Sequence, residues 1–166
     1  MNDLLSEKTI IDVANRLGYH TYKYPRPGVC SDIIIGHILG NGEEEILLIK
    51  RKHEPFKDCW ALPGGFVNEG ERFIEAAKRE LQEETGIVLD KLYPVLVADK
   101  SGRDPRGWTI AHVFEFCFTG NKPKVKAADD AAEYKWFNIR ELPELAFDHE
   151  DILNYWFYQN GYYANN

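Results

Sequence analysis

The sequence predicts one α+β domain arranged as an α/β/α sandwich. Its 166 residues are 44% hydrophobic and 13% aromatic, which is enough to fill the core of one domain. Segments with helical and with β-strand character are mixed along the chain without regular βα alternation. The sequence contains no internal repeat. We therefore expect a single domain over residues 1–166, in which residues 1–27 form an N-terminal helix and a connecting segment.

The first part of the chain is expected to hold a helix and a β-hairpin. Apolar residues recur at helical spacing before the helix-stop residue Gly18, which predicts a helix over about residues 4–17: Ile10, Val13, Ala14 and Leu17. Residues 29–39 and 44–52 are rich in Ile, Val and Leu and flank a Gly-Asn-Gly turn signal, so they predict a hairpin. A loop is expected over about residues 53–67.

The second part of the chain is expected to hold two helices and three strands. The segment between Gly70 and Gly86 is dense in Glu, Ala, Arg, Lys and Leu and has no Pro or internal Gly, which predicts a helix. A last helix is expected over about residues 149–158, capped by Asp148. Strands are predicted at residues 91–98, 109–118 and 133–138.

The charge of the chain limits its partners. Acidic side chains outnumber basic ones by 27 to 20, giving a formal net charge of −7. A protein that holds a nucleic-acid backbone neutralises phosphates with Lys and Arg, so a long DNA or RNA partner is disfavoured. A small anion can still bind where a metal or a local group of Arg and Lys overrides the global charge.

Neither a secretory signal nor a membrane span is predicted. The first residues lack the basic and apolar regions of a signal peptide, and no run approaches the roughly 18 apolar residues of a span. The three cysteines are odd in number and widely spaced, which fits neither a disulfide framework nor a zinc site: Cys30, Cys59 and Cys117. We expect a cytoplasmic protein without membrane contact, whose thiols are inert.

Three carboxylates in the predicted helix 70–86 form an unusual group. At about 100° per residue they spread from beside the apolar stripe across its edge: Glu80, Glu83 and Glu84. Glu84 points nearly toward the core, where an unpaired charge is costly, and three neighbouring carboxylates repel one another. A hard divalent cation resolves both problems, because Mg²⁺ prefers oxygen ligands and binds carboxylates together with substrate phosphate. The group therefore predicts a Mg²⁺ or Mn²⁺ site, with a solvated acidic face as the alternative.

Arg79 lies among these acids. It is within helical reach of Glu75 and Glu83, and a guanidinium group can hold a carboxylate through two parallel hydrogen bonds. We expect Arg79 to orient a carboxylate rather than to take part in the chemistry.

The whole pattern resembles the Nudix box of the Nudix hydrolase family, and all its fixed positions are present: Gly65, Glu71, Arg79, Glu80, Glu83, Glu84 and Gly86. The resemblance implies the Nudix fold, a mixed β-sheet flanked by helices. It also implies that the three helical glutamates and the carbonyl of Gly65 bind the catalytic metals, with Glu71 and Arg79 in support. The metals would neutralise a diphosphate and lower the pKa of the attacking water, releasing a nucleoside monophosphate.

Two segments outside the box resemble ADP-ribose pyrophosphatases. In the loop 99–106, Pro105 matches a mark of that subgroup, and Arg103 and Arg106 offer planar forks for phosphate oxygens or ribose hydroxyls. A solvated polar turn is the alternative. The stretch 47–56 resembles the segment that leads toward the nucleoside site, where Arg51 or Lys50 would meet phosphate. Phe56 would stack on a purine or pack in the core. The resemblance implies hydrolysis of ADP-ribose to AMP and ribose 5-phosphate.

The general base is expected in residues 127–136, which resemble a loop bordering the active site of relatives. Glu133 ranks first and Asp130 second, and Asp129 lies beside them. Acidic loop residues are also often merely solvated. The aromatic residues of segment 155–163 are expected to pack in the core or to form a dimer contact, because relatives that act on ADP-ribose are usually homodimers.

Two other functions are consistent with the sequence. One is a Nudix hydrolase for another nucleotide, such as a sugar nucleotide, a dinucleoside polyphosphate or an oxidised nucleotide. The other is an ADP-ribose-sensing regulatory domain. The sensor is disfavoured because such regulators carry a winged-helix domain, which this chain is expected to be too short to hold, and because the box is intact here.

Overall fold

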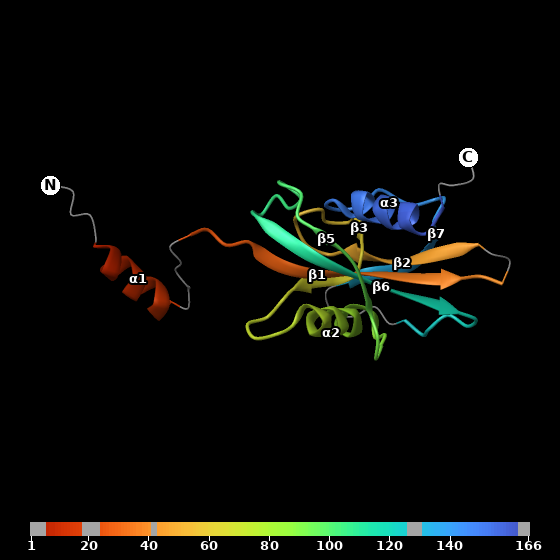
Figure 1. Ribbon diagram of the computed structural model, residues 1–166, viewed down its shortest axis with the longest axis horizontal. Coiled ribbons are helices and arrows are strands. Elements are labelled where there is room, and N and C mark those ends of the chain that lie inside the picture. Colours follow the sequence, from red (N-terminus) through yellow and green to blue (C-terminus); the bar gives the residue numbers. More distant parts are fainter. Residues whose placement is uncertain (1–5, 18–23, 41–42, 126–130, 163–166) are drawn as a thin grey trace.

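A mixed β-sheet forms the centre of the molecule in the computed structural model, which describes residues 6–17, 24–40, 43–125 and 131–162 (Figure 1). Seven strands belong to the sheet within these ranges. They are β1 (Gly28–Ile38), β2 (Glu44–Arg51), β3 (Trp60–Ala61), β4 (Gly64–Phe66), β5 (Tyr93–Ala98), β6 (Thr109–Thr119) and β7 (Ala131–Asn138). The helices are α1 (Glu7–Arg16), α2 (Phe73–Thr85) and α3 (His149–Gln159).

The sheet has the order β3-β2-β1-β6-β5, with β4 added to β1 and β7 added to β2. The β1–β6 pairing is parallel, whereas the other strand pairings are antiparallel. Helix α2 covers one face of the sheet and α3 covers the other, as Figure 1 shows. The predicted α/β/α sandwich with a mixed sheet is thus confirmed.

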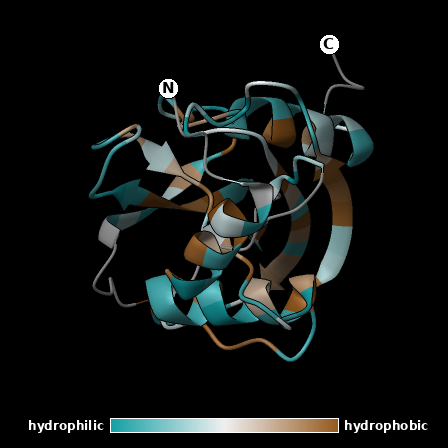
Figure 2. Ribbon diagram, turned by 90° about the vertical axis from the view of Figure 1, so that its left-hand side faces the viewer, coloured by the Kyte–Doolittle hydropathy of each residue, from teal (hydrophilic) through white to brown (hydrophobic). Residues whose placement is uncertain are grey.

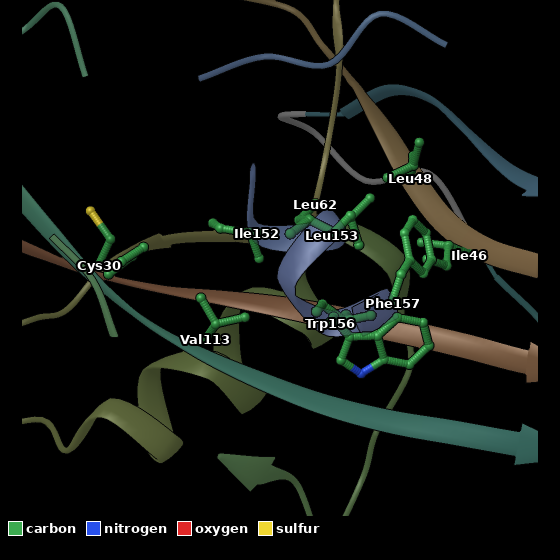
Figure 3. Packing of buried hydrophobic residues seen from close by; sticks show 12 residues of the cluster. Cys30, Ile46, Leu48, Leu62, Val113, Ile152, Leu153, Trp156 and Phe157 are labelled. Atoms are coloured by element: carbon green, nitrogen blue, oxygen red, sulfur yellow. The ribbon is translucent and has the colours of Figure 1, made fainter. Parts of the chain in front are cut away.

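The core has two layers because both faces of the sheet are covered. Under α3 the buried apolar residues come from β1, β2, β5, β6, α3 and the link between β3 and β4, and nine of them are labelled in Figure 3: Cys30, Ile46, Leu48, Leu62, Val113, Ile152, Leu153, Trp156 and Phe157. Under α2 the buried cluster includes Ile33, Ile35, Leu47, Ala77 and Leu81. Successive residues of β1 and β2 enter opposite layers, since side chains alternate along a strand. This is why both strands read as continuous apolar runs. In Figure 2 much of the hydrophobic colour lies in the strands, whereas much of α2 has the hydrophilic colour.

The aromatic C-terminal segment packs largely as expected. Trp156 and Phe157 are buried in the α3 layer, and the ring of Tyr162 stacks on Trp156 with 5.6 Å between centroids. The prediction of core packing is therefore confirmed for these residues. Tyr163 lies outside the described residues. Two aromatic side chains of the segment are exposed: Tyr155 and Tyr158.

The predicted helices agree with the structure, with one difference in capping. The helix expected between Gly70 and Gly86 is α2, and Gly86 ends it with a φ of 72°, a conformation that favours glycine. Helix α3 starts where expected, but the Asp148 side chain makes no capping hydrogen bond. Its carboxylate binds Arg103 instead. Helix α1 falls within the predicted 4–17, although residues 4 and 5 lie outside the described ranges.

The prediction of a loop over residues 53–67 is partly wrong, because this region contains β3 and β4. These strands have two and three residues, too few to show a period of two in the sequence. Strand β4 forms because it pairs with Cys30–Asp32 of β1. The β1–β2 hairpin itself therefore pairs only over Gly36–Ile38. Within the described ranges no helix is both long and apolar enough to cross a membrane.

Candidate active site

The site is built where β4 passes beside α2. Gly64 and Gly65 stand opposite Asp32 and Ser31 of β1. A Cβ on Gly64 would lie 2.4 Å from the carbonyl oxygen of Ser31, and one on Gly65 would lie 2.6 Å from the carboxyl carbon of Glu80. Both distances are too short for real carbon contacts. Gly64 therefore allows β1 to lie close to β4, and Gly65 allows the Glu80 carboxylate of α2 to lie directly against the β4 backbone.

Glu84 is the most enclosed carboxylate of the predicted metal group. Its Oε2 accepts a hydrogen bond from the backbone N–H of Gly64 at 2.9 Å. Burial, aided by the nearby charges of Glu80 and Asp32, raises the pKa of Glu84 to about 8 against the effect of that hydrogen bond. Glu84 thus holds its proton near neutral pH unless a cation takes the proton's place.

The other two glutamates of the group differ in exposure. Burial raises the pKa of Glu80, while a hydrogen bond from Nη1 of Arg79 at 2.6 Å acts in the opposite direction. Glu83 is more exposed, and its Oε2 accepts from the same nitrogen at 3.1 Å. Arg79 therefore links Glu80 and Glu83 in the protein without a metal.

The remaining donors of Arg79 bind the segment before α2. Its Nε and Nη2 donate to the two carboxylate oxygens of Glu71 at 2.9 Å each, and Nη2 also donates to the carbonyl of Phe66 at 3.0 Å. The Arg79 hydrogen bonds hold the pKa of Glu71 at about 2. This geometry is that of an orienting residue, as the sequence predicts. The carboxylate held in the fork is Glu71, however, because Glu75 pairs with Arg72.

The donor set fits a hard divalent cation. Burial raises the pKa of both Glu80 and Glu84, and the three glutamates supply the oxygen ligands that Mg²⁺ prefers. As they stand, no three His, Cys, Asp or Glu side chains in the described part of the chain converge on one point. Arg79 accounts for this, because it holds two of the glutamates. Mg²⁺ usually keeps several waters and substrate oxygens as ligands, so it does not need a closed protein cage.

A cavity of about 100 Å³ lies beside Gly64 and Gly65, and its lining includes Phe147 and three arginines, Arg51, Arg103 and Arg106. The guanidinium carbon of Arg51 lies 4.7 Å from the Phe147 ring centroid, and that of Arg106 lies 5.5 Å from it. Burial, and then the charge of Arg106, lower the pKa of Arg51. Two cations that share one cavity repel each other, so an anion bound between them is favoured.

A larger cavity of about 280 Å³ adjoins the first, because Arg103 and Phe147 line both. Phe56 and Phe147 meet edge to face in its wall, with 4.9 Å between ring centroids. Phe56 is 36% exposed, so its ring is not part of the buried core. The rest of the lining is mostly polar and includes Lys100, Ser101 and Asp151.

The structure separates the arginines of the loop 99–106. The Arg106 side chain is half-exposed and makes a bidentate pair with Asp104, at 3.0 and 2.7 Å. Arg103 is only 8% exposed and donates to Asp148 and Asp32. Arg103 is therefore part of a buried ion-pair network rather than the open phosphate fork expected from the sequence.

The remaining predicted residues lie away from this centre or outside the described ranges. Lys50 pairs with Glu133 at 3.8 Å and lies over the Trp60 ring, and neither Lys50 nor Glu133 lines either cavity. Of the two phosphate candidates on β2, the structure thus brings Arg51 to the site. Asp129 and Asp130 lie outside the described residues.

Three residues of the site are missing from the sequence-based prediction. Asp32 was detectable, because it is a lone charge at the start of the apolar run of β1. His149 accepts the backbone N–H of Leu62 through its Nδ1 at 2.9 Å, a contact over 87 positions that has no local signal. Phe147 belongs to both cavities by virtue of the tertiary fold alone.

Known proteins share this fold and sequence pattern. The NUDIX domain model matches residues 32–156. An ADP-ribose pyrophosphatase of Methanocaldococcus jannaschii is 45% identical over 139 residues, which cover 83% of this chain and 78% of that protein. The ADPR responsive transcriptional repressor NtrR of Acinetobacter baylyi is 34% identical over 139 residues, covering 81% of this chain and 55% of the repressor.

A solved structure is also similar. The bifunctional NMN adenylyltransferase/ADP ribose pyrophosphatase from Francisella tularensis, complexed with AMP and a Mn ion, superposes with a TM-score of 0.72 at 33% identity. The match covers 95% of this chain and 48% of that one.

Proposed function

Because this chain belongs to the Nudix family of hydrolases, we propose that it cleaves the diphosphate of ADP-ribose to AMP and ribose 5-phosphate. One observation carries the proposal. The half-buried carboxylates of Glu84 and Glu80 lie against Gly64 and Gly65, and these glycines line a cavity together with Arg51 and Arg106, so groups for a cation and for a diphosphate meet in one place. The relatives that are named ADP-ribose pyrophosphatases support the choice of substrate.

Mg²⁺ is the proposed cofactor, with Mn²⁺ as a substitute. Glu80, Glu83 and Glu84 would hold the ion with the carbonyl of Gly65. The bound ion would neutralise diphosphate charge and make a water molecule more acidic. Arg79 links the glutamates to the β4 backbone, because it donates to Glu80, to Glu83 and to the carbonyl of Phe66. The Mn ion in the similar Francisella structure supports a divalent metal in this fold.

The two cavities suggest how the substrate lies. Arg51 and Arg106 would contact the diphosphate in the smaller cavity, because guanidinium groups match phosphate oxygens. The adenosine half would extend into the larger cavity, where Phe56 and Phe147 offer aromatic faces for the purine. Glu133 remains the first candidate for the general base from sequence, but its pairing with Lys50 gives that role no support.

A substrate panel tests the proposed function. The purified protein is given ADP-ribose, a sugar nucleotide, a dinucleoside polyphosphate and an oxidised nucleotide, each with Mg²⁺ and each with EDTA. We expect ADP-ribose to have the highest kcat/KM and EDTA to abolish turnover. A higher kcat/KM for another compound would reject ADP-ribose as the substrate, and undiminished turnover in EDTA would reject the metal mechanism.

A second candidate function is ADP-ribose sensing, which the similarity to the repressor of Acinetobacter baylyi favours. A sensor binds ADP-ribose without consuming it, whereas the proposed enzyme converts it. Calorimetric binding of ADP-ribose in the presence of Mg²⁺, without release of AMP, would favour the sensor. The homodimer, tested by analytical ultracentrifugation, and the cytoplasmic location stay predictions.

A further inference from the structure

A network of buried charges lies beneath residues 62–64, which we call the glycine turn, and joins three separate parts of the chain. Arg103 donates through Nε and Nη2 to the two oxygens of Asp148, at 2.9 and 2.8 Å. Its Nη2 also donates to Oδ2 of Asp32 at 3.1 Å. All three residues are at most 9% exposed. Arg103 therefore connects the loop after β5 with β1 and with the start of α3.

Asp32 carries this network to the proposed metal site. It stands opposite Gly64 in the β1–β4 pairing, and a Cβ on Gly64 would lie 2.8 Å from its Oδ1. The carboxylate is thus pressed against the backbone of Gly64. That same backbone donates its N–H to Glu84. A movement of Asp32 would shift the Gly64 backbone and with it the position of Glu84.

His149 holds the other side of the turn. Its Nδ1 accepts the N–H of Leu62 at 2.9 Å, so its proton must lie on Nε2, which is 3.8 Å from Oδ2 of Asp32. The ring is 4% exposed, and burial lowers its pKa, so it is neutral. His149 and Asp32 therefore enclose residues 62–64 between α3 and β1.

We propose that Arg103 is a positioning residue that fixes the metal-binding turn at Gly64 through Asp32. Without Arg103, two buried carboxylates would face each other without a counter-charge, and Asp32 would move away from its place against the turn. The planar fork is required, because an ammonium group is a single point charge and cannot reproduce the bidentate pair with Asp148 while also reaching Asp32. The inference rests on the proposed metal-dependent hydrolysis.

The substitution Arg103→Lys tests the inference, because it keeps the charge and removes the fork. Mn²⁺ binding to the substrate-free protein is measured by titration calorimetry, and kcat and KM for ADP-ribose are measured at saturating Mg²⁺. We expect the Mn²⁺ dissociation constant to rise and kcat to fall, each about 10- to 100-fold, with KM changing by less than about threefold. Circular dichroism shows whether each variant is folded at the assay temperature.

Arg72→Lys is the matched control. Arg72 also donates through two guanidinium nitrogens to a carboxylate, in this case to the single oxygen Oε1 of Glu75, but the pair is on the surface and outside the site. Both measurements should stay at the wild-type values in this variant. Should Arg103→Lys leave Mn²⁺ affinity unchanged and only raise KM, Arg103 would be a direct substrate contact and the positioning role would be rejected.

A second pair of variants, at His149, tests the same network and leaves the buried charge of Arg103 in place. In His149→Asn the side-chain oxygen can still accept the N–H of Leu62, whereas in His149→Leu it cannot. We expect Asn to keep Mn²⁺ affinity within about threefold of wild type and Leu to lose about tenfold or more. Equal Mn²⁺ affinity in the two variants would show that the turn does not depend on this network.

Failure of the inference and failure of the proposed function give different results. If the wild-type protein binds no Mn²⁺ and does not hydrolyse ADP-ribose, the proposed function is wrong. If the wild-type protein does both and the Arg103 and His149 variants bind Mn²⁺ as it does, only the positioning role is wrong.

Discussion

The substitution Glu84→Gln is expected to stabilise the metal-free protein at alkaline pH while it abolishes hydrolysis. Burial raises the pKa of Glu84 from 4.5 to about 8. A group whose pKa is higher in the folded state contributes its full stability below the unfolded pKa and loses it as the pH rises through the folded pKa. The loss therefore falls between about pH 4.5 and pH 8. At ~1.4 kcal/mol per pH unit, the gap between the two values corresponds to about 5 kcal/mol.

Relaxation and water penetration reduce such a penalty, so we expect Glu84→Gln to gain about 2–3 kcal/mol at pH 8.5. The Gln side-chain oxygen can still accept the N–H of Gly64, so the substitution removes mainly the charge. At pH 5 the two proteins should differ by less than about 1 kcal/mol, because Glu84 is then protonated in the folded state and about a quarter protonated in the unfolded state.

Urea unfolding in excess EDTA at pH 5 and pH 8.5 measures these differences. Glu83→Gln is the control, because Glu83 lies on the same helix but its side chain is 58% exposed. Adding Mg²⁺ should reverse the order at pH 8.5, since ligand binding stabilises only the protein that retains the site. A Glu84→Gln variant no more stable than wild type in EDTA at pH 8.5 would refute the reasoning from burial.

Three further substitutions test other parts of the structure. Arg79→Lys should lower kcat for ADP-ribose about 10- to 100-fold with little change in KM, because a lysine cannot donate to both carboxylate oxygens of Glu71 as the guanidinium group does. A rise in KM alone, measured by steady-state kinetics, would contradict this expectation. Arg106→Ala should raise KM roughly tenfold or more by removing a charged hydrogen-bond donor from the smaller cavity, and the same assay would contradict it if KM stayed constant. Trp156→Ala should lower the free energy of unfolding by about 3–5 kcal/mol, measured by urea denaturation, because the ring is buried in the α3 layer; a loss below about 1 kcal/mol would mean that the layer is loosely packed.

Much of the fold was predictable from local patterns. Helix α2 has continuous helix-favouring composition between two glycines, and β1 and β2 are long apolar runs on either side of a turn. The short strands β3 and β4 were not predictable, because two or three residues carry no measurable period and because their pairing partners are β2 for β3 and β1 for β4. Sequence patterns thus gave the long elements, whereas pairing between distant segments created the short ones.

The sequence by itself determined which glutamates lie together in the proposed metal site. Glu80, Glu83 and Glu84 lie on one helix, so the geometry of the helix places them together whatever the rest of the chain does. Gly65 is the required residue because the Glu80 carboxylate lies against it, and the resemblance to the Nudix box had already implied that both belong to one site. Local geometry is encoded locally, which is why these positions could be assigned from the residues alone.

Only the tertiary structure decided the roles of the arginines and of Phe147. Arg103 and Arg106 are three positions apart and look equivalent in sequence. Arg103 is buried, because carboxylates 45 and 71 positions away meet it there, whereas Arg106 pairs with a local aspartate and stays half-exposed beside the cavity. A side chain's function here depends on which distant groups approach it, and that is fixed by the packing of β1 and α3 rather than by its neighbours in sequence.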